Sequence, residues 1–225
     1  MEYENIMKVY IIGAGGFASE LTNYIIDNNN KTNSNIIIEG YFDVTEEQYR
    51  LYSFNRPFLG SEKEFKFPKN SNVYVAIGNS EVRYKVFDFL KNQNINFPNF
   101  IHNTCLISSS AKLGIGNIFC PNVIIGPNTS IGNYNLINYQ SAIPHDCIIG
   151  NMNIFSPNVQ ITGYCHIGDD NFFGVSSGCT PSVHIGDNNK VQAGVIINKN
   201  ISNGNIVFTT EKVREMKLYK NKRSK

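Results

Sequence analysis

The chain has 225 residues, a net charge of +2 and a charged fraction of 17%. This length suits one large or two small domains, and the weak charge gives no strong field for nucleic acid or membrane surfaces. Asn (33) and Ile (29) dominate, but 41% hydrophobic residues exclude disorder through lack of apolar content. No apolar run approaches the roughly 20 residues that span a bilayer. Five cysteines without a C-x-x-C pair, and an N-terminus unlike a signal peptide, lead us to expect a cytoplasmic protein.

The first part of the chain alternates strands and helices. We expect strands over 8–12, 36–42 and 73–77, with helices after the first and third strands. Strand–turn–helix units of this size indicate a small parallel sheet of the doubly wound type, half of a Rossmann-like fold. We place this α/β domain at residues 1–98, in which the stretch 44–72 has no clear period and is interpreted as a long connection.

From about residue 99 the pattern changes to a period of six. Every sixth residue from Ile107 to Ile197 is apolar, and Gly often follows it. Neither a helix nor an alternating strand has this period, whereas hexapeptide repeats form a parallel β-helix whose coils are triangles of three short strands. We therefore predict an all-β, left-handed parallel β-helix over 99–208, followed by a basic tail at 209–225.

Asparagine recurs at the period of one full coil. The positions, 18 residues apart, are Asn99, Asn117, Asn135, Asn153, Asn171 and Asn189. Stacked about 4.8 Å apart, their amides could hydrogen-bond along the axis. A preference for turn residues alone would not select one corner of every coil. The scattered Asn of the first domain, including Asn28, Asn29 and Asn30, are attributed to codon bias.

In a β-helix with coils of 18 residues, residues 18 apart in the sequence are neighbours in space. This relation directs attention to His145. Asp146 follows His145, and Gly163 lies one coil further on. We therefore expect a general base beside a backbone N–H that could bind a developing oxyanion. The alternative is an ordinary solvent-facing histidine, which the adjacent acid and the stacked glycine make less favourable.

The other histidines give no metal site. His166 and His184 are one coil apart and should stack, but a zinc site of three histidines would need a third ligand where this chain has Ile148. We therefore expect an exposed pair and no metal. His102 has no partner recognisable in the sequence.

The turn after the first strand has the form Gly13-x-Gly15-x-x-Ala18. Small residues let the N-terminus of the following helix approach phosphate oxygens, and Asp43 could bind a ribose. Because only half of a dinucleotide fold precedes the repeats, a nucleotide or nucleotide sugar fits better than NAD. A tight turn without a ligand is the alternative.

The chain resembles the bacterial sugar acyltransferases that include UDP-4-amino-sugar and GDP-perosamine N-acetyltransferases, with sialic acid O-acetyltransferases as relatives. The resemblance covers about residues 6–208 and rests on Val9 to Ala18, Ala76 to Arg83 and Asn138 to Gly150. It implies a homotrimer in which acetyl-CoA and the active site lie between neighbouring subunits, while the first domain holds the nucleotide of the acceptor sugar.

The resemblance also implies residue roles. His145 would accept a proton from the sugar amine, Asp146 would orient His145, and the Gly163 N–H would contact the thioester carbonyl. The residues expected to bind acetyl-CoA are Asn138, Ile154, Gly163, Val175 and Ala193. The residues expected to bind the nucleotide sugar are Gly13, Gly15, Gly16, Phe17, Asp43, Gly78 and Asn79. Two departures stand out: Phe17 replaces a histidine of some relatives, and the chain ends in a basic stretch, which we interpret as a solvated tail.

The function expected is therefore N-acetylation, by acetyl-CoA, of a nucleotide-linked 4-amino-4,6-dideoxy sugar for surface polysaccharide or glycan synthesis. The alternatives are O-acetylation of a sugar hydroxyl, including sialic acid, a trimeric nucleotide-sugar-binding protein without chemistry, and, remotely, a metal-dependent hydratase. The nucleotide base and the stereochemistry of the sugar stay open at this point.

Overall fold

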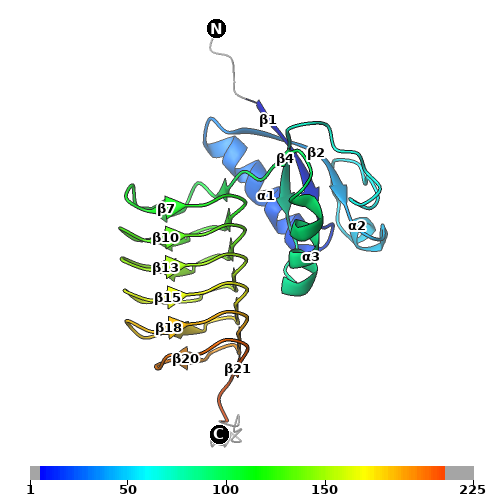
Figure 1. Cartoon of the computed structure of the whole chain (residues 1–225). Coiled ribbons are helices and arrows are strands. Elements are labelled where there is room, and N and C mark those ends of the chain that lie inside the picture. Colours follow the sequence, from blue (N-terminus) through cyan, green and yellow to red (C-terminus); the bar gives the residue numbers. More distant parts are fainter. Residues whose placement is uncertain (1–5, 211–225) are drawn as a thin grey trace, which may run out of the picture.

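The computed structural model describes residues 6–210, which form an α/β domain beside the upper coils of a β-helix (Figure 1). The elements of the α/β domain are β1 (Ile6–Ile12), α1 (Gly16–Lys31), β2 (Asn35–Phe42), α2 (Glu47–Leu51), β3 (Ser71–Val75), α3 (Ser80–Leu90) and β4 (Ile95–Asn96). The four strands are parallel in the order β2-β1-β3-β4. The predicted small parallel sheet is confirmed. No helix of the described part of the chain is long and apolar enough to cross a bilayer.

The two longer helices cover opposite faces of this sheet. Alternate residues of a strand point to opposite faces, and Ile11 of β1 packs with Leu21 of α1, whereas Ile12 packs with Phe87 of α3. The short helix α2 lies in the stretch that we interpreted as a connection. It buries no residue, so it leaves no apolar period in the sequence.

The β-helix has three faces of parallel two-residue strands. The domain face, which meets the α/β domain, comprises β5 (Phe100–Ile101), β8 (Ile118–Phe119), β11 (Leu136–Ile137), β14 (Ile154–Phe155), β16 (Phe172–Phe173), β19 (Lys190–Val191) and β21 (Ile206–Val207). The histidine face comprises β7 (Lys112–Leu113), β10 (Ser130–Ile131), β13 (Ile148–Ile149), β15 (His166–Ile167) and β18 (His184–Ile185). The third face comprises β6 (Leu106–Ile107), β9 (Ile124–Ile125), β12 (Ala142–Ile143), β17 (Gly178–Cys179) and β20 (Ile196–Ile197), with Gln160 bridging β12 and β17.

The period of six produces the core of this left-handed β-helix. The residues at this period point inward and are buried from Phe119 to Ile197, while Ile107 and Leu113 of the first coil are half-buried. Between faces the chain turns through a residue with left-handed backbone, such as Asn122 or Asp146, near φ +60°. Asn and Asp tolerate this conformation better than most residues, which accounts for the corner residues Asn122, Asn128, Asn158 and Asn188.

The predicted asparagine ladder is present, and its amides hydrogen-bond along the axis, as in the 3.0 Å bond from Asn135 Nδ2 to Asn117 Oδ1; bonds to the backbone add to these. From Asn117 to Asn189 its members are fully buried. Each side-chain oxygen accepts the backbone N–H of the next member, as in the 2.8 Å bond from the Asn153 N–H to Asn135 Oδ1. The amide nitrogen of Asn135 donates to the Gly150 carbonyl at 3.0 Å. The ladder therefore satisfies backbone groups that the corner would otherwise leave unpaired.

The two domains are joined by apolar and polar contacts. On the domain face, Ile118 and Ile154 pack with Leu21 and Ile25 of α1. Arg83 of α3 is 1% exposed and donates to the carbonyls of Val75 and Tyr134, and burial lowers its pKa to about 9. Arg83 therefore links α3 to a corner of the β-helix.

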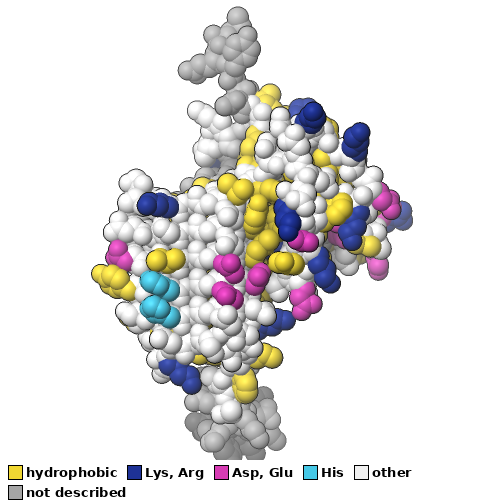
Figure 2. All heavy atoms as spheres, viewed as in Figure 1, with side chains coloured by type: hydrophobic (Ala, Val, Ile, Leu, Met, Phe, Trp, Pro, Cys, Tyr) yellow, Lys and Arg dark blue, Asp and Glu magenta, His cyan; other side chains and the backbone are white. Residues whose placement is uncertain are grey.

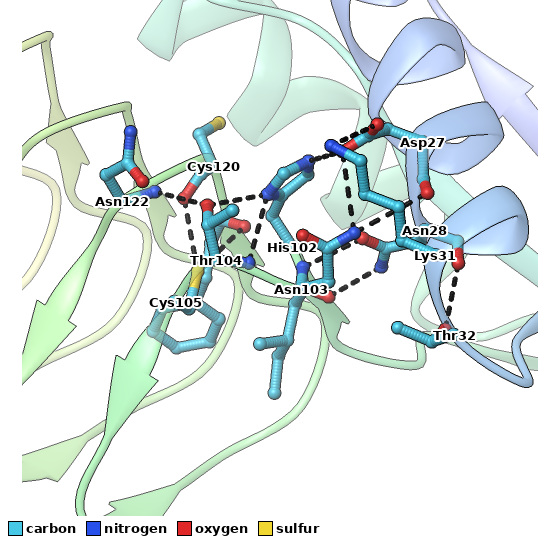
Figure 3. A network of polar contacts seen from close by, with 12 residues as sticks. Asp27, Asn28, Lys31, Thr32, His102, Asn103, Thr104, Cys105, Cys120 and Asn122 are labelled. Carbon is cyan, nitrogen blue, oxygen red and sulfur yellow. Dashed lines mark hydrogen bonds and ion pairs between the residues drawn. The ribbon is translucent and has the colours of Figure 1, made fainter.

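A polar network at the top of the interface includes His102 (Figure 3). The ring nitrogens of His102 lie 3.2 Å from Asp27 Oδ2 and 2.8 Å from Thr104 Oγ1. Asn28 of α1 donates to the Ile101 carbonyl and accepts the Asn103 N–H, both at 2.8 Å. Codon bias is therefore the wrong account of Asn28, which is buried and joins the domains, and His102 has partners that only the fold supplies.

Candidate active site

His145 lies at the corner of the β-helix that follows β12. In the next coil it meets Gly163: a methyl group on Gly163 would lie 2.6 Å from His145 Cε1 and 2.8 Å from Nε2. The structure thus brings together the two residues that the 18-residue spacing pairs. The imidazole lies over the peptide backbone at a place where any larger residue would collide with it.

Asp146 holds one side of this imidazole. His145 Nδ1 lies 2.9 Å from Asp146 Oδ2, and Asn128 Nδ2 donates to Asp146 Oδ1 at 3.1 Å. The hydrogen bonds from His145 and then Asn128 hold the pKa of Asp146 below its usual value. Because the ionised carboxylate can only accept, the Nδ1 proton is donated to it, and Nε2 is left with a lone pair that can take a proton.

The backbone N–H of Gly163 is unused within residues 6–210. At the corner between the histidine face and the domain face, the matching N–H groups are capped by a side chain of the next coil, as when Asn151 Oδ1 accepts the Asn133 N–H at 2.8 Å. The residue one coil after Gly163 is Pro181, whose side chain carries no acceptor. A free donor therefore lies directly beside the candidate base.

Two edges of the β-helix carry the other residues expected near the coenzyme. We call the edge between the third face and the histidine face the His145 edge, and the edge between the domain face and the third face the Val175 edge. Val175 is 48% exposed, and Ala193 stacks on it one coil further on, where the Gly194 N–H donates to the Val175 carbonyl at 2.9 Å. Half-buried Asn138 precedes the same edge and accepts the Tyr139 N–H at 2.8 Å.

The structure does not place Ile154 with these residues. Ile154 is 3% exposed and packs between the domain face and α1. Its side chain points outward from the β-helix, as expected, but the α/β domain covers it. This burial removes Ile154 from the expected coenzyme groove.

The residues expected to bind the nucleotide sugar meet at one edge of the α/β sheet. Strands β1 and β3 are neighbours whose following helices lie on opposite faces, and the carboxyl ends of such strands are where open α/β sheets bind ligands. Gly13 follows β1 with φ +101°, and a methyl group there would lie 2.5 Å from the Ala76 carbonyl oxygen. Gly78 faces open space on the same edge. Only glycine permits this close approach of the two strand ends.

Several of these residues also have structural contacts. Both carboxylate oxygens of Asp43 accept backbone N–H groups, those of Ala14 at 2.9 Å and Val44 at 2.8 Å. Asn79 caps α3 by accepting the Val82 N–H at 3.0 Å. Half-buried Phe17 packs against the core under α1, so it does not simply replace a polar ligand contact.

The N-terminus of α1 is open. Two residues beside it, Tyr52 and Gln48, were not among those expected from the sequence. Gly15 precedes α1 without a side-chain cap, and Gly16 is exposed. The Tyr52 hydroxyl would lie 3.1 Å from a methyl group on Gly16, and Gln48 Oε1 would lie 3.9 Å from one on Gly15. Both come from the stretch without periodicity, where no sequence signal marks them.

The pair His166 and His184 stacks, as expected. Figure 2 shows histidine side chains side by side on the β-helix. The rings of His166 and His184 stack with their centroids 4.4 Å apart. They border a shallow hollow with Ile148 on the histidine face. Within residues 6–210 no three His, Cys, Asp or Glu side chains are grouped to hold a metal ion.

Comparison with known proteins gives two family matches. Residues 8–90 match the PglD N-terminal domain, and residues 165–199 match the hexapeptide repeat of succinyl-transferase. The resemblance to hexapeptide-repeat sugar acyltransferases is thereby confirmed.

Solved structures share the fold over nearly the whole chain. The acetyltransferase domain of PglB from Neisseria gonorrhoeae FA1090, in complex with acetyl coenzyme A, has a TM-score of 0.76 at 20% identity, covering 91% of this chain and 97% of that one. A histidine-to-alanine mutant of GDP-perosamine N-acetyltransferase from Caulobacter crescentus, in complex with CoA and GDP-perosamine, has a TM-score of 0.75 at 22% identity, covering 94% and 98%. WeeI from Acinetobacter baumannii AYE has a TM-score of 0.75 at 23% identity, covering 90% and 97%.

Proposed function

We propose that this chain, which matches the PglD N-terminal domain and the hexapeptide repeat of succinyl-transferase, transfers an acetyl group from acetyl-CoA to the 4-amino group of a nucleotide-linked 4-amino-4,6-dideoxy sugar. The observation that carries the proposal is the His145–Asp146 pair over the free N–H of Gly163. Structures with the same fold are complexes with acetyl coenzyme A or with CoA and GDP-perosamine, which supports the choice of donor and acceptor.

In this reaction His145 Nε2 takes a proton from the sugar amine as the amine nitrogen bonds to the thioester carbonyl carbon. Asp146 stabilises the imidazolium that results. The Gly163 N–H donates to the carbonyl oxygen as negative charge develops there. His145 then returns the proton to the sulfur as the carbon–sulfur bond breaks. The products are the N-acetylated sugar and coenzyme A.

We place the nucleotide at the carboxyl edge of the α/β sheet, against the open N-terminus of α1. Gly13, Gly15 and Gly16 leave the backbone accessible there, and Gly78 leaves room on the neighbouring strand end. Backbone N–H groups at a helix N-terminus bind phosphate oxygens.

We propose further that the site is completed by a neighbouring copy in a homotrimer. Within one chain the Val175 edge and the His145 edge are separated by the third face. That face carries exposed apolar side chains, with Leu106 at 68%, Ile124 at 45% and Ile196 at 58% exposure. A second copy packed there would bury them and bring its own edge to His145.

The test is acetyl transfer from acetyl-CoA to nucleotide-linked amino sugars by wild type and His145→Ala. We expect the variant to lose roughly 100- to 10,000-fold in rate, the usual contribution of a general base. Its thermal stability should not change, because the side chain of His145 is 51% exposed. His184→Ala, about two coils further along on the histidine face, is the matched control and should retain activity. Full activity in His145→Ala would contradict the mechanism.

A further inference from the structure

Tyr164, the residue after Gly163, is in an unusual position for an aromatic side chain. Its backbone is left-handed, with φ +62°, and the residue is 56% exposed. Left-handed backbone is uncommon for bulky residues. Most corners of this β-helix place Asn, Asp, Ser or Gln there, and the bulky exceptions are Tyr134, Met152 and Tyr164.

The other two exceptions are explained by packing between the domains. The ring of Tyr134 lies 4.4 Å from that of Phe87 and 5.4 Å from that of Phe97, centroid to centroid, and Met152 packs against the same cluster. Tyr164 belongs to none of the hydrophobic clusters of the described residues. The stability of the fold therefore gives no reason for an aromatic ring at this corner.

What Tyr164 contacts is the candidate base. Its ring meets that of His145 edge to face, with centroids 5.1 Å apart and an interplanar angle of 82°. Its backbone N–H donates to the His145 carbonyl at 3.3 Å. Asp146 holds Nδ1 and Gly163 lies against the imidazole, and Tyr164 adds a half-exposed aromatic ring in contact with the same imidazole.

We propose that Tyr164 determines acceptor specificity, with the exposed face of its ring packing against the C–H groups of the sugar whose amine meets His145 Nε2. A sugar whose amine meets His145 Nε2 is held beside the imidazole, and the Tyr164 ring lies 5.1 Å from that imidazole, centroid to centroid. Aromatic walls with a few polar groups are the usual lining of sites that orient small ligands. The inference rests on the proposed function and assigns the ring, rather than the hydroxyl, as the contacting group.

The test uses Tyr164→Asn, Tyr164→Phe and the matched control Tyr134→Asn, the last at an equivalent left-handed corner. Thermal unfolding without substrates comes first. Asn suits left-handed backbone, so Tyr164→Asn should keep or raise the melting temperature, whereas Tyr134→Asn should lower it by about 4 °C or more, because a packed ring is lost. A comparable fall in Tyr164→Asn would show that the ring serves the fold and would overturn the proposal.

Steady-state kinetics with acceptor and acetyl-CoA varied separately come second. We expect Tyr164→Asn to raise the KM for the acceptor about 10-fold while the KM for acetyl-CoA stays within about 2-fold, and Tyr164→Phe to behave like wild type. An unchanged acceptor KM in Tyr164→Asn, with active wild type, overturns this inference alone. A wild-type chain that transfers no acetyl group to amino sugars overturns the proposed function, and this inference falls with it.

Discussion

At the scale of single residues, the candidate site depends on Gly163, because glycine has no side chain. Gly163 has neither a left-handed backbone nor a corner that demands glycine. What excludes a larger residue there is the imidazole of His145, whose Nε2 would lie 2.8 Å from an added methyl carbon. Because Gly163 has no side chain, its N–H is also accessible beside His145.

Gly163→Ala should therefore separate chemistry from folding. The added methyl group must displace the half-exposed imidazole, and a misplacement of about 1 Å can cost roughly 100-fold in rate. We expect kcat to fall by about that factor while the melting temperature stays within about 2 °C. Steady-state kinetics and thermal denaturation of the same preparation measure both. A variant with wild-type kcat would show that His145 does not act from its position over Gly163.

At the scale of elements, the β-helix is stabilised by inward apolar columns and by a column of buried amides. Each ladder asparagine satisfies backbone groups of neighbouring coils, as Asn153 does by accepting the Asn171 N–H at 2.9 Å and donating to the Gly168 carbonyl at 2.9 Å. Both bonds are made away from water, since Asn153 is fully buried. Removing one amide leaves a buried donor and a buried acceptor unpaired.

Asn153→Ala should accordingly lower the free energy of unfolding by about 2–6 kcal/mol, since each of the two unsatisfied buried groups costs about 1–3 kcal/mol. Asn198→Ala is the matched control, because Asn198 is exposed and has an ordinary backbone. Its effect should lie within about 0.5 kcal/mol. Denaturant unfolding of the two variants compares them, and equal stability would argue against the ladder as a stabilising element.

At the scale of the whole molecule, the two domains meet through His102, a nearly buried histidine. Burial lowers the pKa of His102 below its usual 6.5, although Asp27 at 3.2 Å acts in the opposite direction. Lys31, which also contacts Asp27, lies on the same side of the network, and the Tyr24 ring meets the imidazole at 5.6 Å. The folded chain therefore binds fewer protons here than the unfolded chain does just below pH 6.5.

This difference makes the junction sensitive to pH. The stabilising contribution of neutral His102 is complete above its unfolded pKa of 6.5 and is lost as the pH falls toward the lower folded pKa. We expect the free energy of unfolding to rise between pH 5 and pH 7.5, and His102→Gln to reduce that rise. His184→Gln, at an exposed site, should leave it unchanged. The lowered pKa of Asp27 acts below 3.8, outside this window. Identical slopes for wild type and His102→Gln would contradict the assignment.

The sequence by itself determined the β-helix and the neighbours within it. In a solenoid of constant coil length, contacts occur at one fixed sequence separation, so the spacing of 18 residues pairs His145 with Gly163 and builds the asparagine ladder. The two strongly periodic helices and the apolar strands of the first domain were also predictable, because local periodicity indicates which face of an element is buried.

Only the tertiary structure decided what happens between the domains. Ile154 has the outward position of a groove residue, yet α1 covers it, and Arg83 is buried by a corner of the β-helix far along the chain. His102 and Asn28 acquire partners in the same way. These contacts join residues at unrelated sequence separations, and they depend on where a nonrepetitive domain docks on a repetitive one. No period in the sequence records that position, because the docking is selected by packing across the whole interface.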